Sequence, residues 1–492
     1  MQLYNNMRFK RNPFEKSTAE EELEYLENVY IKPRYYDSLV DELSKGNSRI
    51  VFGERGIGKT ALMYNLFDEL ENKNSFTIFI DSFDDIPIKL NDTELLVVTI
   101  SRIVKELSLT LLATPIKVKK LSKTEKEKLG FFVHMFFKSM SKSEYESAYC
   151  KVKGVETKNI VKNIYNKFLV GLLNRTLSGV VSILSDTVNK SLGLPNVQST
   201  EIYKAYFPEL KIDKVKEVEL KNYKYSELKL ILDDLTGIIQ KLGWNNIVIL
   251  FDKIDEFKKL NGDVTKIVAF IKDILLDTNL VYYKDVSFAF FLWSRIRIEL
   301  NQENVRYDKY RPKNIDWTLE DLKTILNKRL QYFSIDETKY SFDDLFENQS
   351  DGDKVLRCAN RTPRDLITLL GKIYDEQSHT KIEVKYFSSK SVRDGIDKFL
   401  IDYDFNSIYP KQKGVQITGI SLIEKIKRLG KTEFTISDLA ASTKQGVQTA
   451  RSHIGLMLKY GIVIEIPNPT DGRSNIYQVK DPVVKSIIEK TG

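Results

Sequence analysis

The sequence predicts an α/β protein built around a parallel β-sheet, and two kinds of segment favour this fold class. Short apolar runs with the length and composition of strands buried on both faces occur at 48–52, 76–81, 246–251 and 286–293. Segments with the apolar spacing of helices follow the first two runs, at 61–67 and 92–113. The chain has 492 residues, enough for two to four domains, because one core rarely grows beyond about 250–300 residues.

A glycine-rich loop joins the first predicted strand to the following helix. Residues 53–60 read GERGIGKT, which has the form G-x-x-x-x-G-K-T. Glycines let the main chain approach an anion closely, Lys59 neutralises phosphate charge, and the Thr60 hydroxyl binds Mg²⁺. Strand, loop and helix in this order predict a site for a nucleoside triphosphate. The residues expected to line it are Gly53, Arg55, Gly56, Ile57, Gly58, Lys59, Thr60 and Ala61.

Carboxylates follow the third predicted strand, at 252–256. Asp252 comes directly after the apolar run, where it can hold Mg²⁺ opposite the phosphate loop. Glu256 or Asp255 can position or deprotonate an attacking water, and the sequence leaves both open as the catalytic base. A solvated carboxylate at the start of a helix is the alternative for Glu256.

Several arginines are candidates for contact with the terminal phosphate. Arg295 follows the fourth predicted strand, where a cation can report whether this phosphate is present, and Arg297 is its competitor. Arg361 and Arg364 lie at the start of a later helix that could close over the nucleotide. A surface ion pair is the alternative for each of these arginines. We predict Arg295 as a catalytic residue and Arg364 as a nucleotide contact.

The composition argues against several other classes of protein. Cys150 and Cys358 lie far apart, neither has a Cys or His neighbour at metal-ligand spacing, and the chain has three histidines. Neither a disulfide framework nor a zinc site is therefore expected. Because no stretch of 18 uncharged apolar residues occurs, we predict a cytoplasmic protein without a membrane span. The net charge of +8 permits nucleic-acid binding without demanding it.

Changes of pattern along the chain predict its domains. A helical lead-in with helices at 18–28 and 34–43 precedes the α/β core, and a helical insertion interrupts this core. The apolar stripe of the insertion either packs against the core or forms a surface for a protein partner or a second copy. A helical lid and a C-terminal domain follow, joined by a linker at 410–414. The expected bounds are 1–47 for the lead-in, 48–317 for the core, about 114–225 for the insertion, 318–409 for the lid and 415–492 for the C-terminal domain.

Three helices and a β-hairpin are expected in the C-terminal domain. The helices are predicted at 417–429, from 436 and at 445–459, and the strands at 462–466 and 475–479. This order resembles the winged helix-turn-helix, whose third helix enters the major groove in DNA-binding members. Contact with DNA would then involve Gln448 and Arg451 on that helix and Arg473 at the hairpin tip. Docking of a protein partner and plain packing are the alternatives.

The order of these features resembles the STAND and AAA+ branches of the P-loop ATPases, and within them the prokaryotic FunZ-type group. The resemblance covers roughly 10–110 and 226–405, and its segments are 12–14, 55–62, 252–256, 314–317, 328–330 and 361–367. It implies a P-loop NTPase core with a parallel sheet, a helical insertion, a helical lid and a C-terminal winged helix-turn-helix. Lys253 departs from the Asp-Glu pair of many AAA+ enzymes.

The resemblance also implies a function. We expect a slow ATP hydrolase that uses Mg²⁺, with Lys59 and Thr60 on the phosphates and metal, Asp252 on the metal and Arg295 as a sensor. Its nucleotide state would control oligomerisation or the engagement of a partner or DNA, with prokaryotic defence as one setting. A replication-initiator-like DNA-binding protein and a signalling scaffold with slow or absent turnover are the alternatives.

Overall fold

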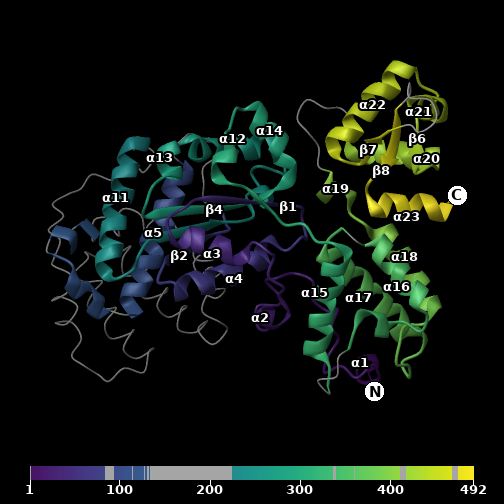
Figure 1. Ribbon diagram of the computed structural model, residues 1–492, viewed down its shortest axis with the longest axis horizontal. Helices are drawn as coiled ribbons and strands as arrows, with labels where there is room; N and C mark the ends of the chain where they lie inside the picture. The colour runs from purple at the N-terminus through teal and green to yellow at the C-terminus, as the bar shows by residue number, and fades with distance from the viewer. Residues whose placement is uncertain are drawn as a thin grey trace.

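The computed structural model describes residues 2–83, 94–113, 115–122, 124–126, 128–129, 132, 224–335, 340–359, 361–409, 417–467 and 475–491. We call residues 35–316 the sheet module, residues 3–14 with 318–409 the helical module, and residues 417–491 the C-terminal module. Figure 1 shows the helical and C-terminal modules together at one end of the sheet module. The predicted linker, Arg473, Cys150 and most of the predicted insertion lie outside the described residues.

A parallel five-stranded sheet forms the centre of the sheet module and confirms the predicted α/β class. Its order is β2-β3-β4-β1-β5, so β4 lies between the strand that leads into the glycine loop and the strand that precedes Asp252. The four longer strands lie where the apolar runs predicted them, whereas no apolar run predicted the two-residue β5. The strands are β1 Arg49–Gly53, β2 Phe76–Ile80, β3 Ile247–Phe251, β4 Val286–Trp293 and β5 Lys313–Asn314.

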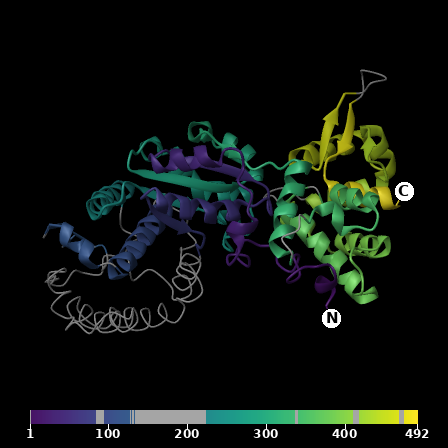
Figure 2. The same ribbon diagram turned by 60° about the horizontal axis from the view of Figure 1, so that its bottom comes forward.

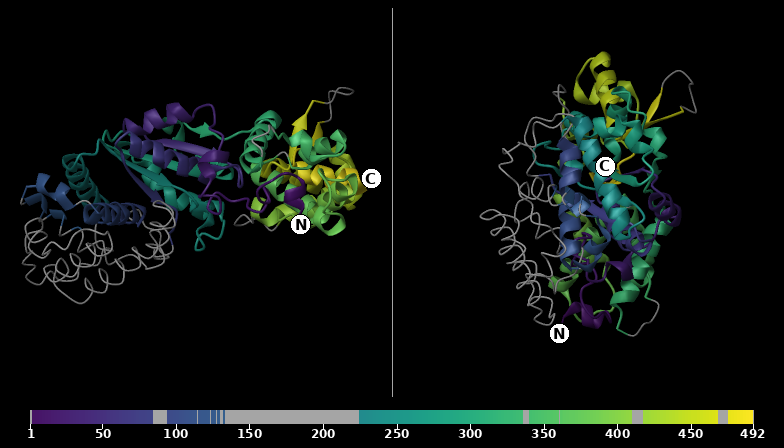
Figure 3. Two further views of the ribbon diagram at one scale, coloured as in Figure 1. Left: turned by 90° about the horizontal axis from the view of Figure 1, so that it is seen from below. Right: turned by 90° about the vertical axis from the view of Figure 1, so that its left-hand side faces the viewer.

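Helices cover both faces of this sheet (Figures 2 and 3). Side chains alternate between the faces of a strand, so Val51 packs in one apolar cluster while its neighbours Ile50 and Phe52 pack in another. The first cluster contains α3 Tyr36–Ser44 and α4 Lys59–Asn72. The second contains α5 Glu94–Ala113, α11 Tyr225–Leu242, α12 Val264–Leu276 and α13 Thr278–Val281. Short helices complete the module: η1 Pro115–Lys120, η5 Ile254–Glu256, η6 Ser294–Ile296, α14 Arg297–Gln302 and η7 Tyr307–Tyr310.

The N-terminal residues belong to the helical module. Leu3, Met7 and Phe9 are buried in its apolar cluster, and α1 Leu3–Asn6 lies there (Figure 1). Residues 15–31, which we call the strap, then run to α3 in the sheet module. The predicted helix at 18–28 is wrong for residues 18–25, because only α2 Leu26–Val29 is helical within the strap. The acidic side chains at 20 and 22 favoured a helix in the sequence. In the structure they form ion pairs with basic side chains of the two neighbouring modules.

Capped amphipathic helices build the helical module. Thr318 caps α15 through the backbone N–H of Asp321 at 3.1 Å, and Thr362 caps α17 in front of Pro363. Cys358 is buried and has a free thiol. The helices are α15 Leu319–Phe333, η8 Phe342–Leu345, α16 Gln349–Cys358, α17 Pro363–Thr380, α18 Ser389–Asp402 and α19 Phe405–Ile408.

The C-terminal module consists of helices around a small antiparallel sheet of order β6-β8-β7. The three predicted helices and the two hairpin strands are present, and a further helix, α23, follows them. Across the described part of the chain, no helix is long and apolar enough to cross a membrane. The elements are α20 Gly419–Leu429, β6 Glu433–Phe434, α21 Ile436–Thr443, α22 Val447–Tyr460, β7 Val463–Ile466, β8 Ile476–Val479 and α23 Pro482–Thr491.

Candidate nucleotide-binding site

The glycine loop turns from β1 into α4 and points the start of that helix at a cavity. Gly56 and Gly58 have φ of +78° and +105°, values that L side chains rarely adopt. A Cβ on Gly56 would also lie 3.0 Å from the Cβ of Arg364, so this glycine allows α17 to approach the loop. Lys59 Nζ donates to the carbonyls of Gly53 at 3.1 Å and Glu54 at 3.0 Å, which holds its charge along the loop.

Asp252 and Thr60, the two predicted metal ligands, lie side by side in the lining of the cavity. The Thr60 hydroxyl donates to Asp252 Oδ2 at 2.6 Å. Asp252 is 1% exposed, and this burial raises its pKa to about 6, against the opposing effects of Lys59 and of the Thr60 hydrogen bond. A buried carboxylate and a hydroxyl side by side fit a divalent cation, which would favour the ionised form of Asp252. No group of three His, Cys, Asp or Glu that could hold a metal occurs among the described residues, so phosphate oxygens and waters would complete the shell.

The two candidates for the catalytic base have different surroundings. Asp255 is buried and accepts a hydrogen bond from Arg55 Nε at 2.9 Å. The guanidinium of Arg55 also lies 4.6 Å from the ring of Trp293. Glu256 is exposed and lines the cavity. The carboxylate of Asp255 is therefore engaged by a cation, whereas that of Glu256 is accessible from the cavity.

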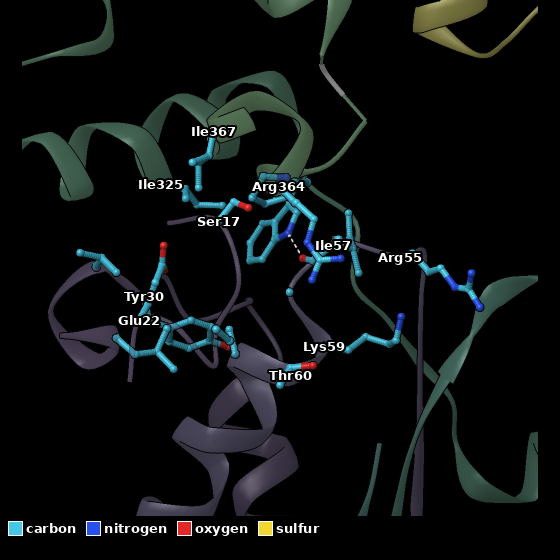
Figure 4. Close-up of a pocket in the computed structure, with 18 of the residues that line it drawn as sticks. Ser17, Glu22, Tyr30, Arg55, Ile57, Lys59, Thr60, Ile325, Arg364 and Ile367 are labelled. Carbon is cyan, nitrogen blue, oxygen red and sulfur yellow. Dashed lines mark hydrogen bonds between the residues drawn. The ribbon is translucent and has the colours of Figure 1, made fainter. Parts of the chain in front are cut away.

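The helical module closes the cavity from the side opposite the glycine loop. Figure 4 shows Arg364, Ile325 and Ile367 facing Lys59 and Thr60 across it. The lining residues come from five segments: Ser17, Ala19, Glu22, Leu26, Val29, Tyr30 and Ile31; Arg55, Gly56, Ile57, Gly58, Lys59, Thr60 and Ala61; Asp252, Lys253, Asp255 and Glu256; Trp317, Ile325 and Arg329; Pro363, Arg364 and Ile367.

The lining of the cavity combines charged and aliphatic side chains. Within the described part of the chain, no carboxylate pairs with the guanidinium of Arg364, so this cation is available to an anion at the loop. Trp317 joins the glycine loop to the helical module, because its Nε1 donates to the Ile57 carbonyl at 2.8 Å. The aliphatic side chains of the strap and the helical module, which include Leu26, Ile325 and Ile367, suit a planar apolar group.

Glu54, inside the loop, does not line the cavity and is the centre of an ionic cluster. Its Oε2 lies 3.4 Å from Arg361 Nη2 and 3.7 Å from Arg295 Nε, and it accepts from Trp293 Nε1 at 3.3 Å. Burial alone would raise the pKa of Glu54, but the two guanidinium groups outweigh it and hold this pKa below its ordinary range. Arg295 and Arg361 therefore contact the loop rather than line the cavity, and the sensor role of Arg295 stays a prediction.

The same arginines reach the C-terminal module. Arg361 Nη1 lies 3.3 Å from Asp481 Oδ2, which also accepts from the Tyr409 hydroxyl at 2.6 Å. Arg295 Nη1 donates to the Tyr460 carbonyl at the end of α22. Asp481 is 3% exposed and its carboxylate caps the start of α23. The cluster thus ties the C-terminal module to the glycine loop, although neither Glu54 nor Asp481 carried a signal in the sequence.

The third helix of the C-terminal module presents a polar face. Ala450, His453 and Ile454 of α22 are buried against the module, whereas Gln448 and Arg451 are exposed. Thr449 and Ser452 are exposed as well. The face that the sequence predicted for DNA contact is thus accessible.

Comparisons with known proteins give distant structural likenesses. No protein-family model matches the chain, and no curated protein matches its sequence. The Aeropyrum pernix ORC2 protein with ADPNP and ADP aligns at 10% identity with a TM-score of 0.42, over 98% of this chain and 99% of that one. The Aeropyrum pernix ORC1 protein in complex with DNA aligns at 10% identity and a TM-score of 0.37, over 96% of each chain. Drosophila ORC bound to DNA aligns at 11% identity with a TM-score of 0.32, over 99% of this chain and 90% of that one. These likenesses are too distant to assign a function.

Proposed function

We propose that this chain is an ATP-binding and ATP-hydrolysing switch that uses Mg²⁺. The observation that carries the proposal is the hydrogen bond between Thr60 and Asp252 at 2.6 Å. It lies beside a G-x-x-x-x-G-K-T loop that leads into a helix and lines a cavity. This contact brings together the two predicted metal ligands, which stand far apart in the sequence.

Each residue has a role that follows from its place. Backbone N–H groups of the loop and Lys59 bind the phosphates, and Arg364 approaches them from the helical module. Asp252 and Thr60 would hold Mg²⁺, which neutralises phosphate charge when bound. Glu256 accepts the proton of the attacking water, because its carboxylate is accessible and Asp255 is engaged by Arg55.

The finer assignment follows the sequence resemblance. We assign the chain to the AAA+ and STAND-like P-loop ATPases, and within them to the FunZ-type group that its sequence resembles. The helical module would act as their lid and the C-terminal module as their winged helix. Assembly of several copies, a role in prokaryotic defence and a cytoplasmic location belong to this proposal, as does a slow turnover.

Binding and hydrolysis of ATP by purified protein test the proposal. Lys59→Ala should abolish ATP binding or weaken it at least about a hundredfold, because a charge-assisted phosphate contact is lost. Lys45→Ala is the matched control, since this lysine pairs with Asp41 on the surface of α3. Unchanged ATP affinity in a folded Lys59→Ala protein would refute the assignment of the loop. Mass measured by light scattering with and without ATP tests the assembly of copies.

DNA binding by the C-terminal module is a second candidate function. It is favoured by the exposed polar side chains of α22, which include Gln448 and Arg451. Nucleotide state could then alter DNA affinity through the ionic cluster that joins Glu54 to Asp481. DNA affinity measured at two salt concentrations, with and without ATP, separates this candidate from a protein-docking role.

A further inference from the structure

The strap is clamped to both of its neighbouring modules by two carboxylates that stand two residues apart. Glu20 pairs with Lys253, which directly follows Asp252 in the sheet module. Glu22 accepts from Arg329 Nη2 at 2.6 Å, and Arg329 lies on α15 of the helical module. The strap therefore bridges the turn that carries the predicted metal ligand and the helix that covers the cavity.

Arg329 makes more contacts with this segment than an incidental ion pair would. Its Nε donates to the Pro13 carbonyl at 2.5 Å and its Nη2 to the Lys16 carbonyl at 2.7 Å. The residue is 2% exposed, and a buried guanidinium is tolerated when its donors are paired in this way. The next residue, Lys328, donates to the Tyr30 carbonyl at 2.6 Å. Helix α15 thus holds the segment at both ends.

The strap depends on these contacts for its position. Only α2 is helical within it, and its other backbone hydrogen bonds close local turns, such as that from the Glu22 N–H to the Ala19 carbonyl at 3.2 Å, which tie it to neither module. Yet seven of the residues that line the cavity come from the strap. They include Ala19, Leu26 and Val29, aliphatic side chains that line the cavity together with Ile325 and Ile367. Figure 4 shows Ile325 and Ile367 across the cavity from Lys59 and Thr60.

We propose that Arg329 is a positioning residue for the nucleobase. It holds the strap against α15, and the strap forms one wall of the space that the base occupies, so the loss of Arg329 loosens that wall and leaves the phosphate contacts in place. This inference rests on the proposed function, because it assumes that the cavity binds ATP. The nucleobase would then be held by the strap between the two modules, whereas the glycine loop binds the phosphates.

The test compares a ligand that has a base with one that lacks it. Wild type and Arg329→Gln are titrated by calorimetry with ATP and with inorganic tripolyphosphate, each with Mg²⁺. The ATP affinity of Arg329→Gln should fall about tenfold or more, and its tripolyphosphate affinity should change less than about twofold. A role in stability alone would lower both affinities alike, and that result would overturn the inference. An unchanged ATP affinity would overturn it too.

Arg49→Gln is the matched control. Arg49 is also buried, and its Nε donates to the carboxylate of Glu42 at 2.7 Å, but it stands at the far end of β1 and does not line the cavity. The Arg49→Gln variant should have a lower thermal midpoint and an unchanged ratio of ATP affinity to tripolyphosphate affinity. A changed ratio would overturn the inference. If Arg329→Gln does not fold, Glu22→Gln takes its place, because the amide oxygen of Gln can still accept a hydrogen bond from the guanidinium. This variant should lower the ATP affinity about threefold and leave the tripolyphosphate affinity unchanged. Equal losses in that variant would overturn the inference.

A wild type that binds tripolyphosphate but not ATP would overturn this inference and also the proposed function. Wild-type binding of ATP, with equal losses for both ligands in the variants, would overturn the inference alone.

Discussion

Replacing Asp252 by Asn should have two effects. It should raise the free energy of unfolding of the ligand-free protein, and it should remove the Mg²⁺-dependent activity. Burial raises the pKa of Asp252 from its ordinary 3.8 to about 6. The folded chain therefore holds more protons than the unfolded chain between about pH 4 and pH 6, and the stability of the wild type falls as pH rises through that window. Each pKa unit corresponds to about 1.4 kcal/mol, so ionisation of this carboxyl costs the folded state about 3 kcal/mol at pH 7.5. Asn resembles the protonated form at every pH and avoids this cost.

The assay is urea unfolding of both proteins without nucleotide at pH 4 and pH 7.5. The other titratable groups are present in both proteins, so most of their contribution cancels and the difference between the two free energies of unfolding reports on Asp252. We expect this difference to move by about 2.4 kcal/mol in favour of Asp252→Asn from the lower to the higher pH, because the unfolded carboxyl, with its ordinary pKa of 3.8, is already more than half ionised at pH 4. A difference that stays constant between the two pH values, or that moves in favour of the wild type, would show that burial does not raise the pKa of Asp252 in the folded protein. With Mg²⁺ and ATP present, the order should reverse, because the wild type alone gains the full binding free energy.

Three further changes have defined outcomes. Glu256→Gln should keep ATP affinity and slow hydrolysis at least about tenfold in a phosphate-release assay, and hydrolysis at the wild-type rate would pass the catalytic role to Asp255. Arg451→Ala should weaken DNA binding in a titration by about 1–3 kcal/mol if its side chain reaches a base, and unchanged affinity would exclude this contact. Asp481→Ala should lower the free energy of unfolding in urea by about 3–5 kcal/mol, because it breaks a pair whose carboxylate is buried and leaves the partly buried Arg361 with one carboxylate fewer. A loss below about 1 kcal/mol would show that the cluster does not tie the modules together.

Local pattern was sufficient for the elements of the sheet and for the loop. Strands buried on both faces are continuous apolar runs, so β1 to β4 stand out in the sequence, whereas the two-residue β5 is too short to do so. The strap shows the opposite case. Its Glu-rich composition favours a helix, but the structure uses Glu20 and Glu22 in ion pairs with Lys253 and Arg329, residues more than two hundred positions away.

The sequence by itself determined which residues can meet a phosphate and a metal, because the loop motif and the strand-end carboxylate are local signals. It left Asp255 and Glu256 open as the catalytic base, and it predicted Arg295 and Arg364 as contacts without their partners. The tertiary structure shows those partners, since it pairs Asp255 with Arg55 and gathers Arg295 and Arg361 around Glu54. The physical reason is that the availability of a charged side chain depends on the partners that burial forces upon it, and those partners come from distant parts of the chain.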